Sequence, residues 1–140
     1  MLLAGLAAGV FSFLLGWVLW DMMGLMDYFG KNTTAAYNAL WKAPENMYMI
    51  GMIISNLAMG GLVAWMLSRM GATTWMAGFM AAAILGGLIT LSLDMFFYSM
   101  MNMYTNKTIV IIDVVVSTVT TGLAGAVAGA VLGMGAKKAA

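Results

Sequence analysis

Three aspartates border or interrupt long apolar stretches of the chain, and they are the residues best placed to do chemistry. Asp21 follows the first apolar stretch, Asp94 ends the third, and Asp113 lies near the start of the fourth. A carboxylate within a membrane-spanning helix is costly and marks an ion or proton pathway by default. If folding brings the three together, they form an acidic cluster in an outward-facing vestibule that could bind a cation or a proton.

The depth of these aspartates supports a second, structural interpretation. At 1.5 Å per residue, Asp94 would lie about 28 Å along its helix from the opposite interface, and Asp113 only about 8 Å into its own helix. A carboxylate at Asp113 in the first helical turn would favour the helix N-terminus. Asp21 and Asp94 would then reach the interface or pair with Lys31 or Lys107. From the residues alone we favour this structural interpretation.

One amide interrupts the middle of the second apolar stretch. Asn56 lies about 14 Å from the start of that stretch and is its only strongly polar side chain near mid-depth. Polar side chains within a membrane commonly bond across helices. We therefore expect Asn56 to bond to Ser12, Thr120 or Thr121.

Methionine is the second unusual residue type, with 17 copies in the chain. Soft thioethers can bind Cu(I), and Met22 and Met26 have the one-turn spacing of a shared ligand face. The chain has no Cys and no His, however, and Met66 and Met70 repeat the same spacing near the opposite end. Methionine also fills irregular apolar gaps. The sequence therefore predicts no metal and no other cofactor.

Long apolar stretches must position all of these residues. The 140-residue chain is 64% hydrophobic and 8% charged, whereas soluble proteins carry about 25% charged residues. A membrane-spanning helix needs roughly 20 apolar residues. The stretches that reach this length, or come within a residue of it, are Met1–Trp20, Met47–Ser68, Trp75–Leu93 and Thr108–Met134. We predict an all-α, integral membrane bundle of four transmembrane helices.

The connections set the order of the helices. We expect a single domain, residues 1–140, with helices at approximately 1–27, 47–70, 74–103 and 108–134. A tight turn at Gly71–Thr74 and a short link at Tyr104–Lys107 favour antiparallel neighbours, and hence an up-down-up-down topology. The apolar start lacks a basic leader and exceeds the 7–15 residues of a signal core, so we expect a retained first helix.

Positive charge gives little guidance on orientation. Arg69, Lys137 and Lys138 fall on the side of the N-terminus, and Lys31, Lys42 and Lys107 fall on the other side. The positive-inside rule is thus balanced. We expect cytoplasmic termini and a bacterial inner (plasma) membrane location.

Small residues recur at helical spacing and indicate close helix packing. They include Gly16 in the first stretch, Gly78 and Gly86 in the third, and Gly125, Gly129 and Gly133 in the fourth. Small residues let helix backbones approach in lipid, where no hydrophobic drive joins the helices. The stripes could pack within the chain, or the stripe of the fourth stretch could face another subunit.

Three short segments of the chain resemble segments of a known protein family. They are Phe13-Leu14-Leu15-Gly16-Trp17-Val18-Leu19-Trp20, Ile111-Ile112-Asp113 and Gly129-Ala130-Val131-Leu132-Gly133. The chain resembles the DUF1761-type family of small four-helix bacterial membrane proteins of unknown function. The resemblance implies the four-helix fold and no activity. Asp21 departs from the family, which has an aromatic or small polar residue there.

The sequence carries no complete catalytic constellation, and no basic run suggests nucleic acid. We therefore expect a non-enzymatic protein whose partners are the lipid bilayer and other membrane subunits or further copies of itself. Its function would be that of an accessory or structural subunit. The alternative is a small cation or proton transporter or channel that uses the outer acidic cluster with Asn56.

Overall fold

The computed structural model of the chain describes residues 1–137, and every named element within them is a helix. Within these residues, four helices are long and apolar enough to cross a membrane, and they span Leu2–Met22, Met49–Met70, Trp75–Met100 and Thr108–Gly135. The predicted all-α chain with four candidate membrane helices is confirmed at this level.

The long helices are α1 (Leu2–Trp17), α4 (Met49–Met70), α5 (Trp75–Met100) and α6 (Thr108–Lys137). A π-helical turn, η1 (Val18–Met22), extends α1. The connection to α4 contains two short helices, α2 (Leu25–Asn32) and α3 (Ala35–Asn38), and a 3-10 turn, η2 (Pro44–Asn46). The first long helix thus ends at Met22, earlier than the expected residue 27.

The early end of the first helix has a backbone cause at Gly24. This residue has a φ of +74°, a left-handed conformation that glycine adopts without the penalty paid by other residues. The chain turns there, and α2 begins as a separate helix at Leu25. Met22 and Met26 therefore lie on different elements, η1 and α2, and do not share the face of one continuous helix.

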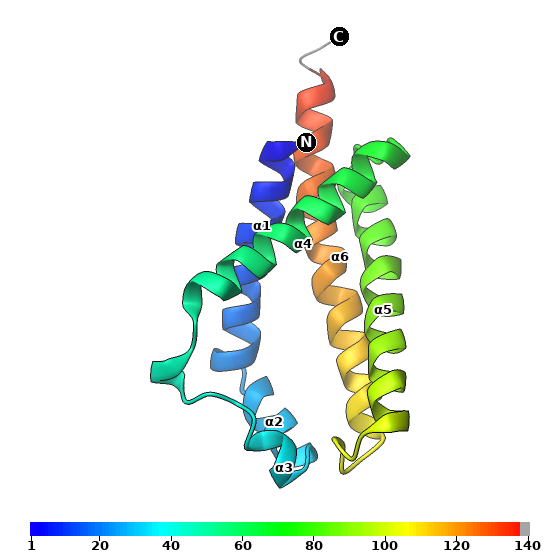
Figure 1. Cartoon of the computed structure of the whole chain (residues 1–140). Coiled ribbons are helices and arrows are strands. Elements are labelled where there is room, and N and C mark those ends of the chain that lie inside the picture. The colour runs from blue at the N-terminus through cyan, green and yellow to red at the C-terminus, as the bar shows by residue number, and fades with distance from the viewer. Residues whose placement is uncertain (138–140) are drawn as a thin grey trace.

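Helices α5 and α6 lie side by side along much of their length (Figure 1). Their backbones approach so closely that a Cβ added at Gly78 would collide with the carbonyl oxygen of Gly125. A Cβ at Gly129 would collide with the carbonyl oxygen of Thr74 in the same way. Glycine removes the side chains that would hold the helices apart, and dispersion contacts between backbones then supply packing energy.

A second close approach joins α1 to α4, which crosses the bundle obliquely (Figure 1). A Cβ at Gly60 would lie 2.5 Å from both the Gly5 oxygen and the Gly9 nitrogen. Close by, Ala8 and Ala64 are fully buried. The crossing belongs to a core in which the start of α1, the end of α4, the start of α5 and the later part of α6 meet.

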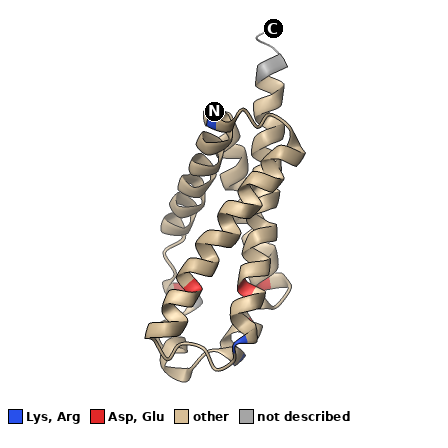
Figure 2. Ribbon diagram, turned by 90° about the vertical axis from the view of Figure 1, so that its right-hand side faces the viewer, with Lys and Arg blue, Asp and Glu red and all other residues tan. Residues whose placement is uncertain are grey.

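The two ends of the bundle consequently differ. The N-terminus and the α4–α5 turn lie at one end, and α2, α3 and the α5–α6 loop lie at the other, which we call the loop end (Figure 1). Away from the core, α4 makes few contacts with α5. Most of the described ribbon carries no charged residue, and the acidic residues lie toward the loop end (Figure 2).

Hydrogen bonds tie the two loop-end segments to each other. The Thr34 N–H donates to the Met103 carbonyl at 3.0 Å, and the Thr105 N–H donates to the Asn32 carbonyl at 3.0 Å. The Thr34 hydroxyl also donates to the Asn102 carbonyl at 3.0 Å. The α2–α3 corner is thereby fixed beside the α5–α6 loop.

Candidate functional site

Asp94 is the most deeply buried carboxylate of the described chain. Asp94 lies near the C-terminal end of α5 and is 5% exposed. The Tyr104 hydroxyl, folded back from the α5–α6 loop, donates to Asp94 Oδ1 at 3.0 Å. Asp94 Oδ2 is buried and has no hydrogen-bond partner among the described residues. The partner of Asp94 is thus a tyrosine, where we had expected Lys31 or Lys107.

Asp113 lies on α6 close enough to Asp94 for the two carboxylates to interact electrostatically. A short loop joins α5 to α6, so the end of one antiparallel helix meets the start of the other. Asp113 is not in the first turn of α6, and helix-dipole stabilisation falls off beyond that turn. The expected position of Asp113 in the first turn of α6 is therefore wrong, and the carboxylate lies instead within electrostatic reach of Asp94.

Asp21 does not join this pair as a ligand group. It is exposed on η1, and residues 1–137 contain no set of three or more acidic, His or Cys side chains placed to hold a metal ion. Of the three aspartates in the possible acidic cluster, an interaction is described between Asp94 and Asp113. Asp21 lies on η1, whereas Asp94 and Asp113 lie on α5 and α6.

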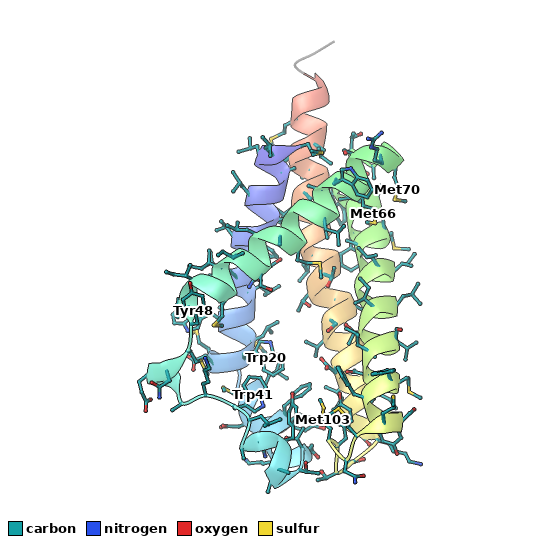
Figure 3. The ribbon with its side chains drawn as sticks, viewed as in Figure 1. Trp20, Trp41, Tyr48, Met66, Met70 and Met103 are labelled. Carbon is teal, nitrogen blue, oxygen red and sulfur yellow. The ribbon has the colours of Figure 1, made fainter. Side chains whose placement is uncertain are left out.

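The first cavity at the loop end is mainly aromatic and measures about 310 Å³. Trp20 and Phe29 form one wall, with ring centroids 4.9 Å apart. Tyr37 and Trp41 form another, with centroids 6.2 Å apart and an edge-to-face arrangement. Trp20 and Trp41 lie near each other, and Met103 lies across from them on the α5–α6 loop (Figure 3). Tyr104 and Asp113 complete the polar part of the lining.

A second cavity of about 210 Å³ lies deeper, between α1, α4 and α6. Hydroxyl and amide side chains from all three helices line it, namely Ser12, Asn56, Ser117, Thr120 and Thr121. Trp20 and Asp113 line both cavities. Asp113 therefore stands at the boundary between the aromatic cavity and the hydroxyl-lined one.

Asn56 reaches this second cavity without the cross-helix bond that we expected. Its Nδ2 donates to the Met52 carbonyl of its own helix at 2.9 Å. Ser12, Thr120 and Thr121 face the same cavity. Because α4 runs obliquely, the cavity lies between these side chains and Asn56. The Thr120 hydroxyl donates instead to the Ser117 carbonyl, at 3.3 Å.

Two tyrosines beside the carboxylates are held neutral. Burial raises the pKa of Tyr104 well above the usual value near 10, and its hydrogen bond to Asp94 raises that pKa further. Burial also raises the pKa of Tyr37, with the charge of Asp113 as the next cause. Both phenols are thus hydrogen-bond donors at physiological pH.

The predicted packing glycines fall into two groups. Those in the α5–α6 contact are Gly78, Gly86, Gly125 and Gly129, and Gly133 meets Thr73 in the turn just before α5. Gly16, in contrast, would place a Cβ with no atom within 4 Å, and it lines the second cavity. In the described residues, the stripe of α6 therefore faces α5 of the same chain.

Sequence reasoning missed two features of the site. The α1–α4 crossing uses Gly5 and Gly9, which have the same four-residue spacing as the stripes that were recognised. The aromatic cavity was missed because its rings come from separate segments of the chain, η1, α2 and the α3 region. The one-turn spacing of Tyr37 and Trp41 was the available signal for a shared aromatic wall.

Comparison with protein-family models, with curated proteins and with solved structures finds no match for this chain.

Proposed function

We propose that the chain is a membrane protein that binds a cation or a proton at Asp94 and Asp113 and transports it across the membrane. The proposal includes an up-down-up-down arrangement of the four spans and cytoplasmic termini in a bacterial inner membrane. The short α4–α5 and α5–α6 connections support that topology. The loop end would then face outward.

The observation that carries the proposal is the unpaired oxygen of Asp94. A buried carboxylate without a partner loses several kcal/mol of solvation, so it is protonated or paired with a cation. Tyr104 supplies one hydrogen bond to Oδ1, and Oδ2 has none among the described residues. Asp113 adds a second carboxylate nearby rather than a compensating positive charge. A bound proton or cation would supply the missing partner.

The two cavities support a route to and from this pair. Asp113 lines both, and ionisable residues inside membrane bundles characteristically face cavities that carry water or ions. The deeper cavity extends beside Gly60 and Val63 of α4, near the middle of that helix. Hydroxyl groups there can replace part of the hydration shell of an ion.

The test is the movement of cations into proteoliposomes that contain the full chain. Protons, Na⁺, K⁺ and tetramethylammonium are each offered under an imposed membrane potential, and charge movement is recorded. We expect at least one cation to move, and Asp94→Asn and Asp113→Asn each to reduce that movement about tenfold or more. Asp27→Asn, a change in an exposed acidic residue of α2, is the matched control and should leave the movement unchanged.

The comparison of the wild type with the two aspartate variants decides whether the proposal holds. Equal movement in the wild type, Asp94→Asn and Asp113→Asn would refute the proposal, as would the absence of movement for every cation offered. The helical circular dichroism of each variant establishes that folding is retained. Asp113→Glu, which keeps the charge, should retain movement where Asp113→Asn does not.

A second candidate function is that of an accessory or structural subunit, or of a homo-oligomer. The limited contact between α4 and α5 favours it, because this leaves one side of the oblique helix uncovered by the described chain. The glycine stripe of α6, however, is occupied by α5. Purification in a gentle detergent with mass analysis should return stoichiometric partners or a homo-oligomer, and a lone monomer would count against this candidate.

We propose no catalytic activity and no cofactor. Membership of the DUF1761-type family remains a proposal that rests on the sequence resemblance alone, and it adds the expectation of the same four-helix fold.

A further inference from the structure

We propose that the aromatic cavity at the loop end binds a small organic ammonium ion, with a quaternary ammonium group as the preferred chemistry. The inference rests on the proposed cation function and names the class of cation. Its basis is the joint presence, in one cavity, of aromatic walls, the Asp113 carboxylate and the Tyr104 phenol that donates to buried Asp94.

The first step is the composition of the walls. The pairs Trp20–Phe29 and Tyr37–Trp41 come from η1, α2 and the α3 region. Their rings offer electron-rich faces, which attract a cation placed within about 6 Å of a ring centroid. Such attraction is stronger where water is excluded, and Trp20 is partly buried.

The second step is the charge of the cavity. Asp113 is its one ionisable carboxylate, and within the described chain no Lys or Arg is found in its lining. Tyr104 connects the cavity to Asp94, since it lines the space and donates to Asp94 Oδ1. The Asp113 carboxylate is thus presented to the cavity directly, and Asp94 is linked to the cavity only through Tyr104.

The third step distinguishes an organic cation from a metal ion. Hard cations such as Ca²⁺ require six to eight oxygen ligands, and residues 1–137 hold no group of three metal-ligating side chains. A quaternary ammonium ion has no N–H to donate, so aromatic faces and a nearby carboxylate satisfy it fully. The apolar surface of its methyl groups also suits Met26 and Met103 in the lining.

The size of the space limits the ligand. The cavity measures about 310 Å³, at the lower end of the roughly 300–1,000 Å³ range of small-molecule sites. It accommodates a single small headgroup rather than a large polycyclic cation. Trp41 is 52% exposed, so a ligand can reach the cavity past this ring.

The test is a calorimetric titration of choline into the full chain in lipid nanodiscs. The neutral comparison is 3,3-dimethyl-1-butanol, which replaces the ammonium nitrogen by carbon and keeps the shape. KCl and NaCl are titrated separately. We expect choline to bind, the neutral alcohol to bind at least tenfold more weakly, and Asp113→Asn to reduce choline affinity about tenfold or more.

The tryptophans provide a matched pair of variants. Trp41→Leu should weaken choline binding roughly tenfold, and Trp41→Phe should restore part of the loss because it keeps a ring. Trp65, on α4 and outside the cavity lining, is 49% exposed against 52% for Trp41. Trp65→Leu should therefore leave choline affinity unchanged.

Three results would overturn the inference. Equal binding of choline and of the neutral alcohol would show an apolar cavity without cation recognition. Equal effects of Trp41→Leu and Trp65→Leu would remove the aromatic wall from the site. Binding confined to protons, Na⁺ or K⁺ with dependence on Asp94 and Asp113 would retain the proposed function and refute the organic cation.

Discussion

The α5–α6 contact makes a quantitative prediction about Gly125. A Cβ at this position would collide with the Cβ of Ala82 and with the carbonyl oxygen of Gly78. Neither atom can rotate away, because one is a first side-chain atom and the other is backbone. Gly125→Ala must therefore separate the two helix axes or distort a helix.

The magnitude follows from two opposing effects. Overpacking a tight contact costs about 1–3 kcal/mol, whereas replacing a mid-helix glycine by alanine gains up to about 1 kcal/mol of helix propensity. Gly61→Ala on α4 is the matched control, since a Cβ there meets no atom within 4 Å. Subtracting the control removes the propensity gain, so the difference between the two variants should be about 1–3 kcal/mol, with Gly125→Ala the less stable.

The assay is reversible unfolding in mixed micelles, with increasing denaturing detergent and helical circular dichroism as the signal. Separating α5 from α6 should also move Asp94 away from Asp113, so Gly125→Ala should reduce the cation movement described above while Gly61→Ala preserves it. Equal unfolding free energies for Gly125→Ala and Gly61→Ala would refute the close approach of the two helices.

Two further predictions concern the loop end. Gly24→Ala should destabilise the chain by about 1–2 kcal/mol because Gly24 has a φ of +74°. Gly30→Ala should not destabilise it, since Gly30 also has no atom within 4 Å of its added Cβ but has no positive φ. Equal effects of the two changes on the free energy of unfolding would contradict the backbone explanation. Tyr104→Phe should lower the free energy of unfolding by about 1–3 kcal/mol because it removes the one hydrogen bond described for buried Asp94. Tyr98→Phe changes an exposed residue and should lower the free energy of unfolding little. Since burial raises the pKa of Tyr104, its contribution is fully present below about pH 10 and is lost as the pH rises through the folded-state pKa; ultraviolet absorbance should therefore show a late-ionising phenol that Tyr104→Phe removes.

Local patterns predicted the helices well and their ends less well. The turn at Gly71–Thr74 lies where expected, with Gly71 left-handed at a φ of +67° and the Thr74 hydroxyl accepting from the Ala77 N–H. Those signals act within four residues and can be recognised in sequence. The break at Gly24 was missed because apolar residues continue on both sides of it, so hydropathy gives no sign that the helix stops.

The candidate site was predicted only in part. Asp94 and Asp113 were recognised as chemically distinctive residues, and the antiparallel α5–α6 pair brings them together. Asp21 lies exposed on η1, and its membership of the cluster stays a prediction, because which side chains meet depends on a helix arrangement that no local pattern records. Asn56 was assigned cross-helix partners for the same reason, and its bond to Met52 stays within α4.

The sequence by itself determined that this chain has four apolar helices of membrane-spanning length with charge confined mostly to their ends, because hydrophobic length and turn chemistry are local properties of the chain. The tertiary structure decided which polar groups meet. Glycine contacts close one end of the bundle at Gly60 and hold α5 against α6 at Gly125. The same geometry leaves α1 and α4 diverging from the α5–α6 pair toward the loop end, and Asp113 lines two cavities there. Such an outcome depends on backbones that touch across distant parts of the sequence, and so only the folded chain could establish it.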